Sequence, residues 1–460
     1  MLCNKTKRND TMTPIYADIL IIGAGPAGLV AANTANENYP DKKIILLKEF
    51  EKNQVPCGIP YVFGPTLGSV EKNAMSCGTP VPNVQVLVDT VIKVDISAKT
   101  AASATTLYSF DKLIFATGSL PFVHASFQDA MHLQNVFSIG KSYDNVKKMK
   151  ECIEDKKQIT VIGTGFIGVE IATELAMMGK DVTIVGGGGI LEGSFDPDMA
   201  MQAQAIMQEK GIKLSLGQHA TGIKSSQNKA YAIELCDGTI LDAEVVLLAT
   251  GYQPNTKLAA DAGLKLARYG SIWVDEYMRT KYKDIFAIGD CSARRDFITR
   301  DPSKVMLAST SAAEARVAGS SLYSLKTLKG FNGTIAIFST MIGERAFASA
   351  GVTESRAKEE NIDYISGFFE GFNRHPATIP DAAKQSVKLI AMKNSAQIIG
   401  GQVIGGKEAG EIINIIGLAI EAELTLHHLI SLQIATQPLL TAAPTNYPIV
   451  KAAQNALKKR

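Results

Sequence analysis

The chain has 460 residues, of which 46% are hydrophobic and 20% are charged, so several domains with large cores are expected and disorder is not. A formal net charge of +2 with scattered basic residues argues against nucleic acid or membrane lipid as a partner. Six cysteines without CxxC spacing, and no long apolar run, argue against a zinc site, a disulfide framework or a membrane span and predict a cytoplasmic protein with free thiols.

The first strong pattern is a nucleotide-binding unit. Residues 18–22 and 44–47 are apolar runs that predict parallel strands, with a helix between them that ends near Asn38. The turn before the helix has the pattern GxGxxG, whose glycines permit a tight turn, approach of the backbone to a pyrophosphate, and close contact of helix and strand. The helix N-terminus offers N–H groups to the phosphates. We therefore predict a dinucleotide site that includes Gly23, Gly25, Pro26, Ala27 and Gly28.

The end of the second strand departs from this fingerprint. An acidic residue that binds the ribose is expected to close the strand, but Lys48 occupies that position and Glu49 follows it. Glu49 is a candidate for contacting the ribose hydroxyls, and a solvent-exposed turn carboxylate is an equally good interpretation.

The same unit recurs 140 residues later, counted from Gly23 to Gly163. Residues 158–162 and 182–185 predict strands, and the helix between them is expected to end at Gly179. Two such units imply two dinucleotides or two halves of one. The second predicted site includes Gly163, Gly165, Phe166, Ile167 and Gly168.

The strand that closes this second unit ends in four glycines, residues 186–189. A carboxylate at this point would favour NAD, and a nearby arginine would favour a 2′-phosphate. The strand end has neither, so the sequence leaves the choice between NADH and NADPH open.

Three further motifs follow predicted strands. Residues 116–118 and 249–251 both read Ala-Thr-Gly, and residues 285–290 end in Gly289 and Asp290. In this order, and together with the two GxGxxG turns, they resemble the pyridine nucleotide–disulfide oxidoreductases, flavoproteins with two dinucleotide-binding domains. The resemblance extends over residues 17–460.

The resemblance implies that the first unit binds FAD and that the second binds NADH or NADPH. It implies that Asp290 binds a ribityl hydroxyl of FAD and that a helix over about residues 307–319 directs its N-terminus at the flavin. Phe166 matches an aromatic gate over the flavin, and Glu170 matches a carboxylate near the nicotinamide pocket; a packing phenylalanine and a solvent-exposed carboxylate are the alternatives. The implied cofactor-binding set also contains Ala116, Thr117, Gly118, Gly251, Gly289 and Ala308.

Cys57 lies just past the second strand, between Pro56 and Gly58. Family members that resemble glutathione reductase carry CxxxxC here, but the matching fifth residue is Val62. The pattern is instead similar to a single-cysteine branch: coenzyme A-disulfide reductases, NAD(P)H oxidases and peroxidases, and persulfide reductases. Cys57 would then cycle as a mixed disulfide or a sulfenic acid, with its pKa lowered by a helix N-terminus and positive neighbours. A small buried side chain is the alternative.

Cys77 and Cys291 lie outside this motif. Cys77 is a candidate resolving thiol, with an ordinary loop cysteine as the alternative, and Cys291 is expected to be a packing residue.

The last third of the chain changes pattern. Residues 334–338, 366–370, 387–391 and 398–403 predict strands, and an amphipathic helix is expected over residues 408–423. This segment resembles the interface domain of the family, which implies a homodimer in which each chain lends residues to its partner's active site.

A change near the C-terminus agrees with the single-cysteine interpretation. Family members with two cysteines carry a His-Pro pair here, and this chain has Gln437 and Pro438. Tyr447 is the first candidate proton donor, with an interface aromatic as the alternative, and His375 is the second candidate.

We therefore predict an α/β fold with two Rossmann-like three-layer domains and a C-terminal α+β dimerisation domain. The expected boundaries are 17–135 and 279–330 for the FAD domain, 136–278 for the NAD(P) domain, and 331–460 for the interface domain. The predicted enzyme passes electrons from NAD(P)H through FAD to Cys57, and then to a low-molecular-weight disulfide, persulfide or polysulfide, with coenzyme A-linked species favoured. One alternative is an NAD(P)H oxidase or peroxidase that uses Cys57 as a sulfenic acid. The other is an electron carrier or redox-sensing interaction protein that does not use Cys57.

Overall fold

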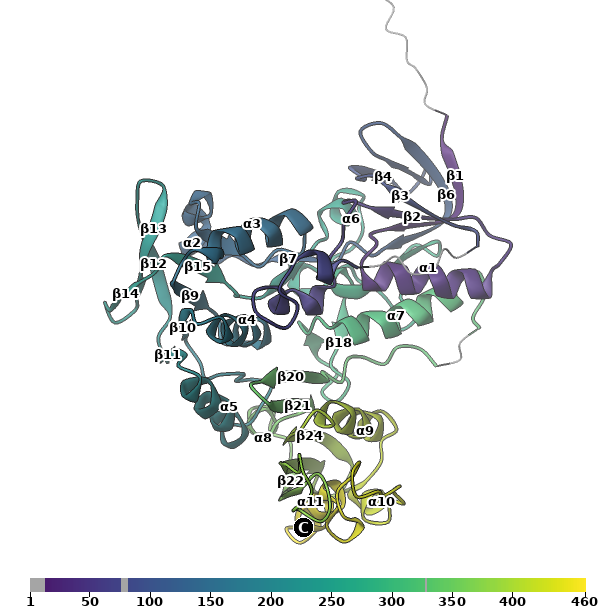
Figure 1. Cartoon of the computed structure of the whole chain (residues 1–460). Coiled ribbons are helices and arrows are strands. Elements are labelled where there is room, and N and C mark those ends of the chain that lie inside the picture. Colours follow the sequence, from purple (N-terminus) through teal and green to yellow (C-terminus); the bar gives the residue numbers. More distant parts are fainter. Residues whose placement is uncertain (1–12, 76–81, 327–328) are drawn as a thin grey trace, which may run out of the picture.

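The computed structural model describes residues 13–75, 82–326 and 329–460, which form two nucleotide-binding units and a C-terminal domain (Figure 1). Cys77, the candidate resolving thiol, lies outside the described residues. Within the described part of the chain, no helix is long and apolar enough to cross a bilayer.

The first unit is built on a sheet with the strand order β3-β2-β1-β6-β5-β4, in which β6 also pairs with β17. β1 pairs in parallel with β2 and β6, and β17 pairs in parallel with β6. Helices α1 and α7 lie side by side along the unit (Figure 1). The predicted strands and helices are confirmed, with longer strands than expected. The elements are β1 (Ile15–Ile22), α1 (Pro26–Asn38), β2 (Ile44–Lys48), β3 (Val84–Val88), β4 (Lys93–Asp95), β5 (Thr100–Ala102), β6 (Leu107–Phe115), β17 (Ile285–Ala287) and α7 (Ala308–Ser320).

The second unit has a parallel sheet with the strand order β11-β10-β9-β15-β8. A three-stranded antiparallel sheet, β12-β13-β14, is attached to it. The elements are β8 (Val136–Ser138), α3 (Tyr143–Glu154), β9 (Gln158–Ile162), α4 (Phe166–Met177), β10 (Asp181–Gly186), α5 (Pro197–Glu209), β11 (Lys213–Leu216), β12 (Ala220–Ser226), β13 (Lys229–Leu235), β14 (Ile240–Asp242) and β15 (Val245–Leu248).

The chain passes between the two units along a short antiparallel ribbon. β7 (Ser119–Pro121) leads into the second unit and pairs with β16 (Tyr252–Pro254), which leads out of it. Residues beyond β16 return to the first unit, because Ala259, Leu264 and Ile272 share its buried apolar cluster. We therefore propose that the second unit ends near residue 254, earlier than the boundary at 278 that the sequence suggested.

The C-terminal domain is an antiparallel sheet with the order β20-β21-β24-β23-β22, covered by α9 and α11. Three of the four predicted strands are confirmed. The prediction of a strand over 334–338 is wrong, because Ala336 has a φ of 58°, Thr334 forms only an isolated bridge with Asp296, and pairing in the sheet starts at Phe338. The elements are β20 (Phe338–Ile342), β21 (Arg345–Gly351), α8 (Glu354–Glu359), β22 (Tyr364–Phe372), β23 (Lys384–Met392), β24 (Ile398–Gly405), α9 (Ala409–Glu421), α10 (Leu426–Ile430) and α11 (Pro448–Leu457).

A buried charge cluster joins this domain to the second unit. Lys388 on β23 donates to Asp196, Asp198 and Glu354 at 3.3, 2.7 and 3.2 Å. Asp196 is the N-cap residue of α5, but its carboxylate accepts hydrogen bonds from Gln402 and the backbone of Ser355 instead of capping the helix. These bonds fix how the two domains meet, since loss of the Lys388 ammonium would leave the buried Asp196 carboxylate without its cation.

Candidate active site

The strand ends of the first unit form one continuous edge. The backbone N–H of Gly23 donates to Leu47 on β2, that of Ala116 to Ile22 on β1, and that of Ile288 to Phe115 on β6. The turns that carry the predicted FAD-binding residues therefore leave the sheet side by side, at the carboxyl ends of parallel strands, where α/β proteins bind ligands.

The glycines of the first turn are required by close backbone contacts. A Cβ on Gly23, whose φ is 111°, would lie 2.2 Å from the Ala116 oxygen, and one on Gly28 would lie 1.9 Å from the Gly23 oxygen. A Cβ on Gly25 would meet nothing within 4 Å. Gly23 and Gly28 thus hold α1 against the sheet, and Gly25 leaves open space at the helix N-terminus, so the residues present fit a dinucleotide pyrophosphate.

The N-termini of α1 and α7 converge on the Asp290 motif. A Cβ on Gly289 would lie 3.0 Å from the Ala27 Cβ and 3.6 Å from the Ser311 Oγ. Ala308 is the first residue of α7. Two helix N-termini with their positive dipole ends and unpaired N–H groups therefore reach the place where Asp290 leaves β17.

The second turn repeats the first. A Cβ on Gly163 would lie 2.2 Å from the Ala249 oxygen, and one on Gly168 would lie 2.1 Å from the Gly163 oxygen, whereas Gly165 has open space around it. Gly251, with a φ of 95°, follows the same strand end. The second site is therefore built by the same contacts as the first.

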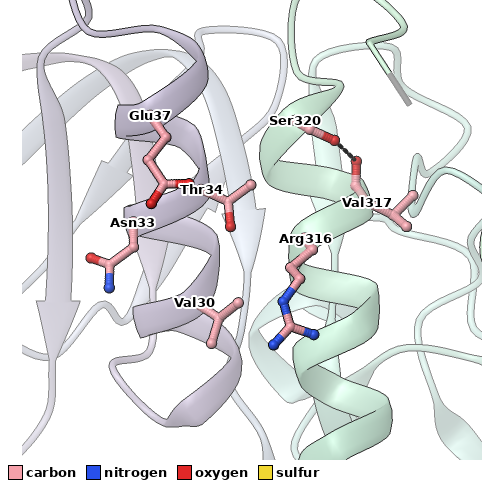
Figure 2. Close-up of a pocket in the computed structure, with 7 residues that line it drawn as sticks. All are labelled: Val30, Asn33, Thr34, Glu37, Arg316, Val317 and Ser320. Carbon is pink, nitrogen blue, oxygen red and sulfur yellow. Dashed lines mark hydrogen bonds between the residues drawn. The ribbon is translucent and has the colours of Figure 1, made fainter.

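Two features of the first unit lie at its surface. Glu49 is exposed and its contact with a ribose stays a prediction. A surface pocket is lined by residues from the middle and C-terminal parts of α1 and α7, away from the Gly25 end (Figure 2), and we assign it no part in the site. Its lining residues are Val30, Asn33, Thr34, Glu37, Arg316, Val317 and Ser320.

Asp290 forms a charged group with two residues from other segments. Its carboxylate accepts hydrogen bonds from the Ser119 hydroxyl at 2.7 Å and the Lys141 ammonium at 3.1 Å. Burial acts to raise the pKa of Asp290, but Lys141 and Ser119 outweigh it and hold the pKa below its ordinary value. Asp290 is therefore an ionised acceptor at neutral pH, as binding a hydroxyl requires.

A fully buried ion pair stabilises the backbone of the Asp290 motif. Arg294 Nε lies 3.2 Å from Glu314 Oε1, and Glu314 Oε2 accepts hydrogen bonds from Gly289 N–H at 2.7 Å and Ser292 Oγ at 3.0 Å. Burial raises the pKa of Glu314, and Arg294 opposes that shift. The pair fixes the backbone from which Asp290 projects.

Cys57 lies in a three-residue 3-10 turn, Pro56–Gly58, and not at the N-terminus of the helix that was expected. An α-helix that starts at Pro56 would need an N–H donor at Pro60, and proline has none. The turn is anchored because Ile59 and Val62 are buried in an apolar cluster with Val169 on α4 and Phe347 on β21. Cys57 itself is exposed, and no described cysteine is paired with it.

The prediction that the pKa of Cys57 is lowered is also wrong for the chain by itself. Partial burial of the sulfur raises the thiol pKa, and the carboxylates of Glu170 and Asp290 add to that shift, while Lys141 opposes it. Lys141 also lies 4.5 Å from the ring centroid of Tyr252. Cys57 is therefore close to the same charged group that contains Asp290.

Glu170 connects three parts of the molecule beside Cys57. Its carboxylate on α4 accepts hydrogen bonds from Thr340 on β20, at 2.7 Å, and from Tyr61 in the Cys57 loop. Burial raises the pKa of Glu170 to about 7, so neither protonation state dominates at neutral pH. The interpretation as a solvent-exposed helix position is wrong, whereas its contact with nicotinamide stays a prediction.

Phe166 is the first residue of α4 and packs in an aromatic group. Its ring is stacked on Phe338 with 4.9 Å between centroids and lies 6.4 Å from Phe195. Its role as a gate stays a prediction, because the residue both packs against the C-terminal domain and stands at the turn of the second site.

We expect the unfolding stability to depend on the ionisation of Glu170. With an unfolded pKa near 4.5 and a folded pKa of about 7, the folded state binds more protons in this range, so stability falls as pH rises from 5 through 7 and becomes level about one unit above the folded pKa. The loss is on the order of 3 kcal/mol. The midpoint temperature of thermal unfolding should change less between pH 5 and pH 8 in Glu170→Gln than in the original chain. Glu151→Gln, at an exposed glutamate, is the control and should keep the pH dependence of the original chain. An equal pH dependence of the unfolding temperature in Glu170→Gln and the original chain would contradict the raised pKa of Glu170.

The two candidate proton donors lie in the C-terminal domain. His375 Nδ1 is 3.0 Å from the Thr441 oxygen, and its backbone N–H donates to Pro438, so the loop of His375 lies against the loop of Gln437. Tyr447 precedes α11, and burial raises its pKa. Figure 1 separates α11 from the loop that follows β2, so a meeting with Cys57 would need a second copy of the chain.

Three residues of this arrangement were missed in the sequence. Lys141 follows strand β8 at the same sheet edge as the second glycine turn, and that position was a usable signal. Tyr61 lies four residues after Cys57, and its place in the same loop was a usable signal. Thr340 gave no signal, because only the packing of β20 against α4 brings its hydroxyl to Glu170.

The comparison with protein families gives two matches that together extend over most of the chain. Residues 17–315 match the model described as pyridine nucleotide-disulphide oxidoreductase. Residues 337–447 match the dimerisation domain of the same group.

Individual proteins agree with these matches. The chain is 28% identical over 456 residues to an NADH oxidase of Methanocaldococcus jannaschii, covering 96% of this chain and 98% of that protein. It is 29% identical over 407 residues to an NAD(P)H coenzyme A polysulfide/persulfide reductase of Pyrococcus horikoshii, covering 84% and 87%. Among solved structures, an NAD-dependent persulfide reductase from A. fulgidus superimposes with a TM-score of 0.88 at 29% identity, covering 96% of this chain and 83% of that one.

Proposed function

Since the chain belongs to the pyridine nucleotide-disulphide oxidoreductase family, and is thus an FAD-dependent oxidoreductase that uses NADH or NADPH, we propose that it reduces low-molecular-weight sulfur compounds at Cys57. The favoured substrates are disulfides, persulfides or polysulfides, with coenzyme A-linked species first. The observation that carries this proposal is Cys57 itself: it is exposed beside the charged group of Asp290 and Lys141, and the buried Val62 stands where a second cysteine would be needed.

FAD, when bound, supplies a two-electron link between nicotinamide and sulfur. The residues that fit it are Gly23, Gly25 and Gly28 at the pyrophosphate, and Asp290 with the α7 N-terminus at the ribityl and flavin end. The second unit, with Gly163, Gly165 and Gly168, fits the nicotinamide dinucleotide.

The chemistry at Cys57 follows from thiol exchange. The Cys57 thiolate attacks one sulfur of the substrate, the S–S bond breaks, and one thiol leaves with a proton. The Cys57 mixed disulfide then takes up two electrons from NAD(P)H and one proton, and releases the second thiol. The overall reaction consumes one NAD(P)H, one proton and one S–S bond; a disulfide yields two thiols, and a persulfide yields one thiol and hydrogen sulfide. Lys141 favours the thiolate form, and the Pro56–Gly58 turn keeps the sulfur accessible.

The proton for the leaving thiol is proposed to come from Tyr447 of a second copy, since burial keeps its hydroxyl protonated through neutral pH. Tyr447→Phe should lower turnover with a disulfide by about a hundredfold, with the rate of flavin reduction by NADH unchanged. His375→Ala is the matched variant, because His375 lies in the same domain and is the other candidate proton donor. Full turnover in Tyr447→Phe with a loss in His375→Ala would transfer the role to His375.

The proposal is tested by anaerobic reduction of the protein with NADH or NADPH, followed by separate additions of coenzyme A disulfide, coenzyme A persulfide, polysulfide, peroxide and oxygen. Rapid oxidation by a sulfur compound, with slow oxidation by peroxide and oxygen, is expected. The reverse pattern would favour the alternative of an NAD(P)H oxidase or peroxidase with Cys57 as a sulfenic acid, an alternative supported by the relatives named NADH oxidase.

A further inference from the structure

The end of β10 in the second unit cannot supply a carboxylate of its own. A Cβ on Gly186, the last residue of the strand, would lie 2.3 Å from the Thr164 Cγ2. Thr164 follows Gly163 in the turn of the second site, so a side chain at position 186 would push against that turn. A larger residue at this strand end would therefore have to displace the Thr164 side chain, and the glycine present carries no carboxylate.

A carboxylate reaches this place from the next turn of the chain. Glu192 Oε2 accepts a hydrogen bond from the Gly189 N–H at 2.6 Å, and a Cβ on Gly188 would lie 2.1 Å from the same oxygen. The four glycines thus make room for the side chain of Glu192 to lie back over the strand end.

The turn that carries Glu192 is held in place on both sides. The Leu191 N–H donates to the Thr164 oxygen at 2.9 Å, and the Leu191 side chain is buried. The Glu192 N–H donates to the Gly189 oxygen at 3.3 Å. Glu192 is therefore tied, through its neighbour, to the same turn that is predicted to hold the phosphates.

Open space remains beside this carboxylate. The nearest atom to a Cβ on Gly187 would be the Cβ of His219, at 3.9 Å, and the Gln218 N–H donates to the Gly186 oxygen at 3.3 Å. The strand end is thus bordered by Glu192 and by the segment of His219, with a bare stretch of backbone near them.

We propose that Glu192 selects NADH over NADPH. The inference rests on the proposed function, in which the second unit holds the nicotinamide dinucleotide. In that site the carboxylate accepts hydrogen bonds from the adenosine ribose hydroxyls of NADH and repels the 2′-phosphate of NADPH. The negative charge at the end of β10 then comes from Glu192, six positions beyond Gly186.

The test measures binding and needs no turnover. The FAD-loaded protein is titrated in a calorimeter with ADP-ribose and with 2′-phospho-ADP-ribose, which carry the adenosine ribose but no nicotinamide. ADP-ribose should bind about tenfold more tightly. Glu192→Gln keeps the size of the side chain and its acceptor oxygen, and should reduce this preference about fivefold, mainly through tighter binding of the phosphorylated compound. Glu209→Gln, an exposed glutamate on α5, should leave the preference unchanged.

Each outcome has a distinct meaning. Equal binding of the two compounds to the original chain, or an unchanged preference in Glu192→Gln, overturns the inference and leaves the proposed function intact. If neither compound binds and neither NADH nor NADPH reduces the flavin, the assignment of the second unit is wrong and the proposed function falls with the inference. Flavin content of the variant reports whether it has folded.

Discussion

Cys57→Ser is expected to lower the reduction of sulfur substrates by about a thousandfold or more, since a serine hydroxyl is not ionised at neutral pH and cannot form the mixed disulfide. Reduction of the bound flavin by NADH should persist, because the second unit is untouched. The measurement is anaerobic stopped-flow absorbance of the flavin, first with NADH and then with the sulfur acceptor.

Cys236→Ser is the matched control, as Cys236 is also an exposed cysteine but lies in the second unit. It should behave as the original chain does. If Cys57→Ser retained full acceptor reduction, the protein would be an electron carrier or redox-sensing protein that does not use this thiol, and the proposed chemistry would be wrong.

Gly28→Ala should abolish retention of FAD, and Gly168→Ala should abolish reduction by NADH while FAD is retained. In each case the added Cβ would lie about 2 Å from a backbone oxygen, 1.9 Å at Gly28 and 2.1 Å at Gly168, so the helix must move away from the strand. Overpacking typically costs about 1–3 kcal/mol, and a backbone oxygen cannot move aside as the end of a side chain can. The measurements are the ratio of flavin to protein absorbance and the rate of flavin reduction.

The control for this pair is Gly222→Ala, on β12. Its Cβ would meet nothing within 4 Å and its backbone is not left-handed, so FAD content and reduction should be unchanged. Loss of FAD in Gly168→Ala, with FAD retained but NADH reduction lost in Gly28→Ala, would exchange the assignments of the two units.

The sequence was most informative where function depends on backbone contacts between near neighbours. The requirement for Gly23 and Gly28, or for Gly163 and Gly168, comes from a strand, a turn and a helix that are consecutive in the chain. Such units can be recognised without knowledge of the rest of the molecule, which is why both glycine turns and most of the strands around them were predicted correctly.

The environment of Cys57 could not be predicted in the same way. Its turn depends on Pro60, whose missing N–H prevents the α-helix that was expected at Cys57. The raised pKa of the thiol depends on Glu170 and Asp290, which come from other domains or segments. The false strand at 334–338 has a similar cause: Ile335 and Ile337 are apolar because they pack against the C-terminal core, and not because they pair.

The ribbon of β7 and β16 has a consequence for the order in which this chain matures during synthesis. The first unit is interrupted after β7, and it regains β17 and Asp290 only after the whole second unit has been made. Because a chain emerges from the ribosome N-terminus first, the inserted unit, whose two ends meet in the ribbon, has all its strands while the first unit still lacks one. The flavin-binding edge is therefore among the later parts of the molecule to be completed. A polypeptide that stops before residue 285 would contain the complete set of strands for only one of the two nucleotide sites, because the first unit would lack β17.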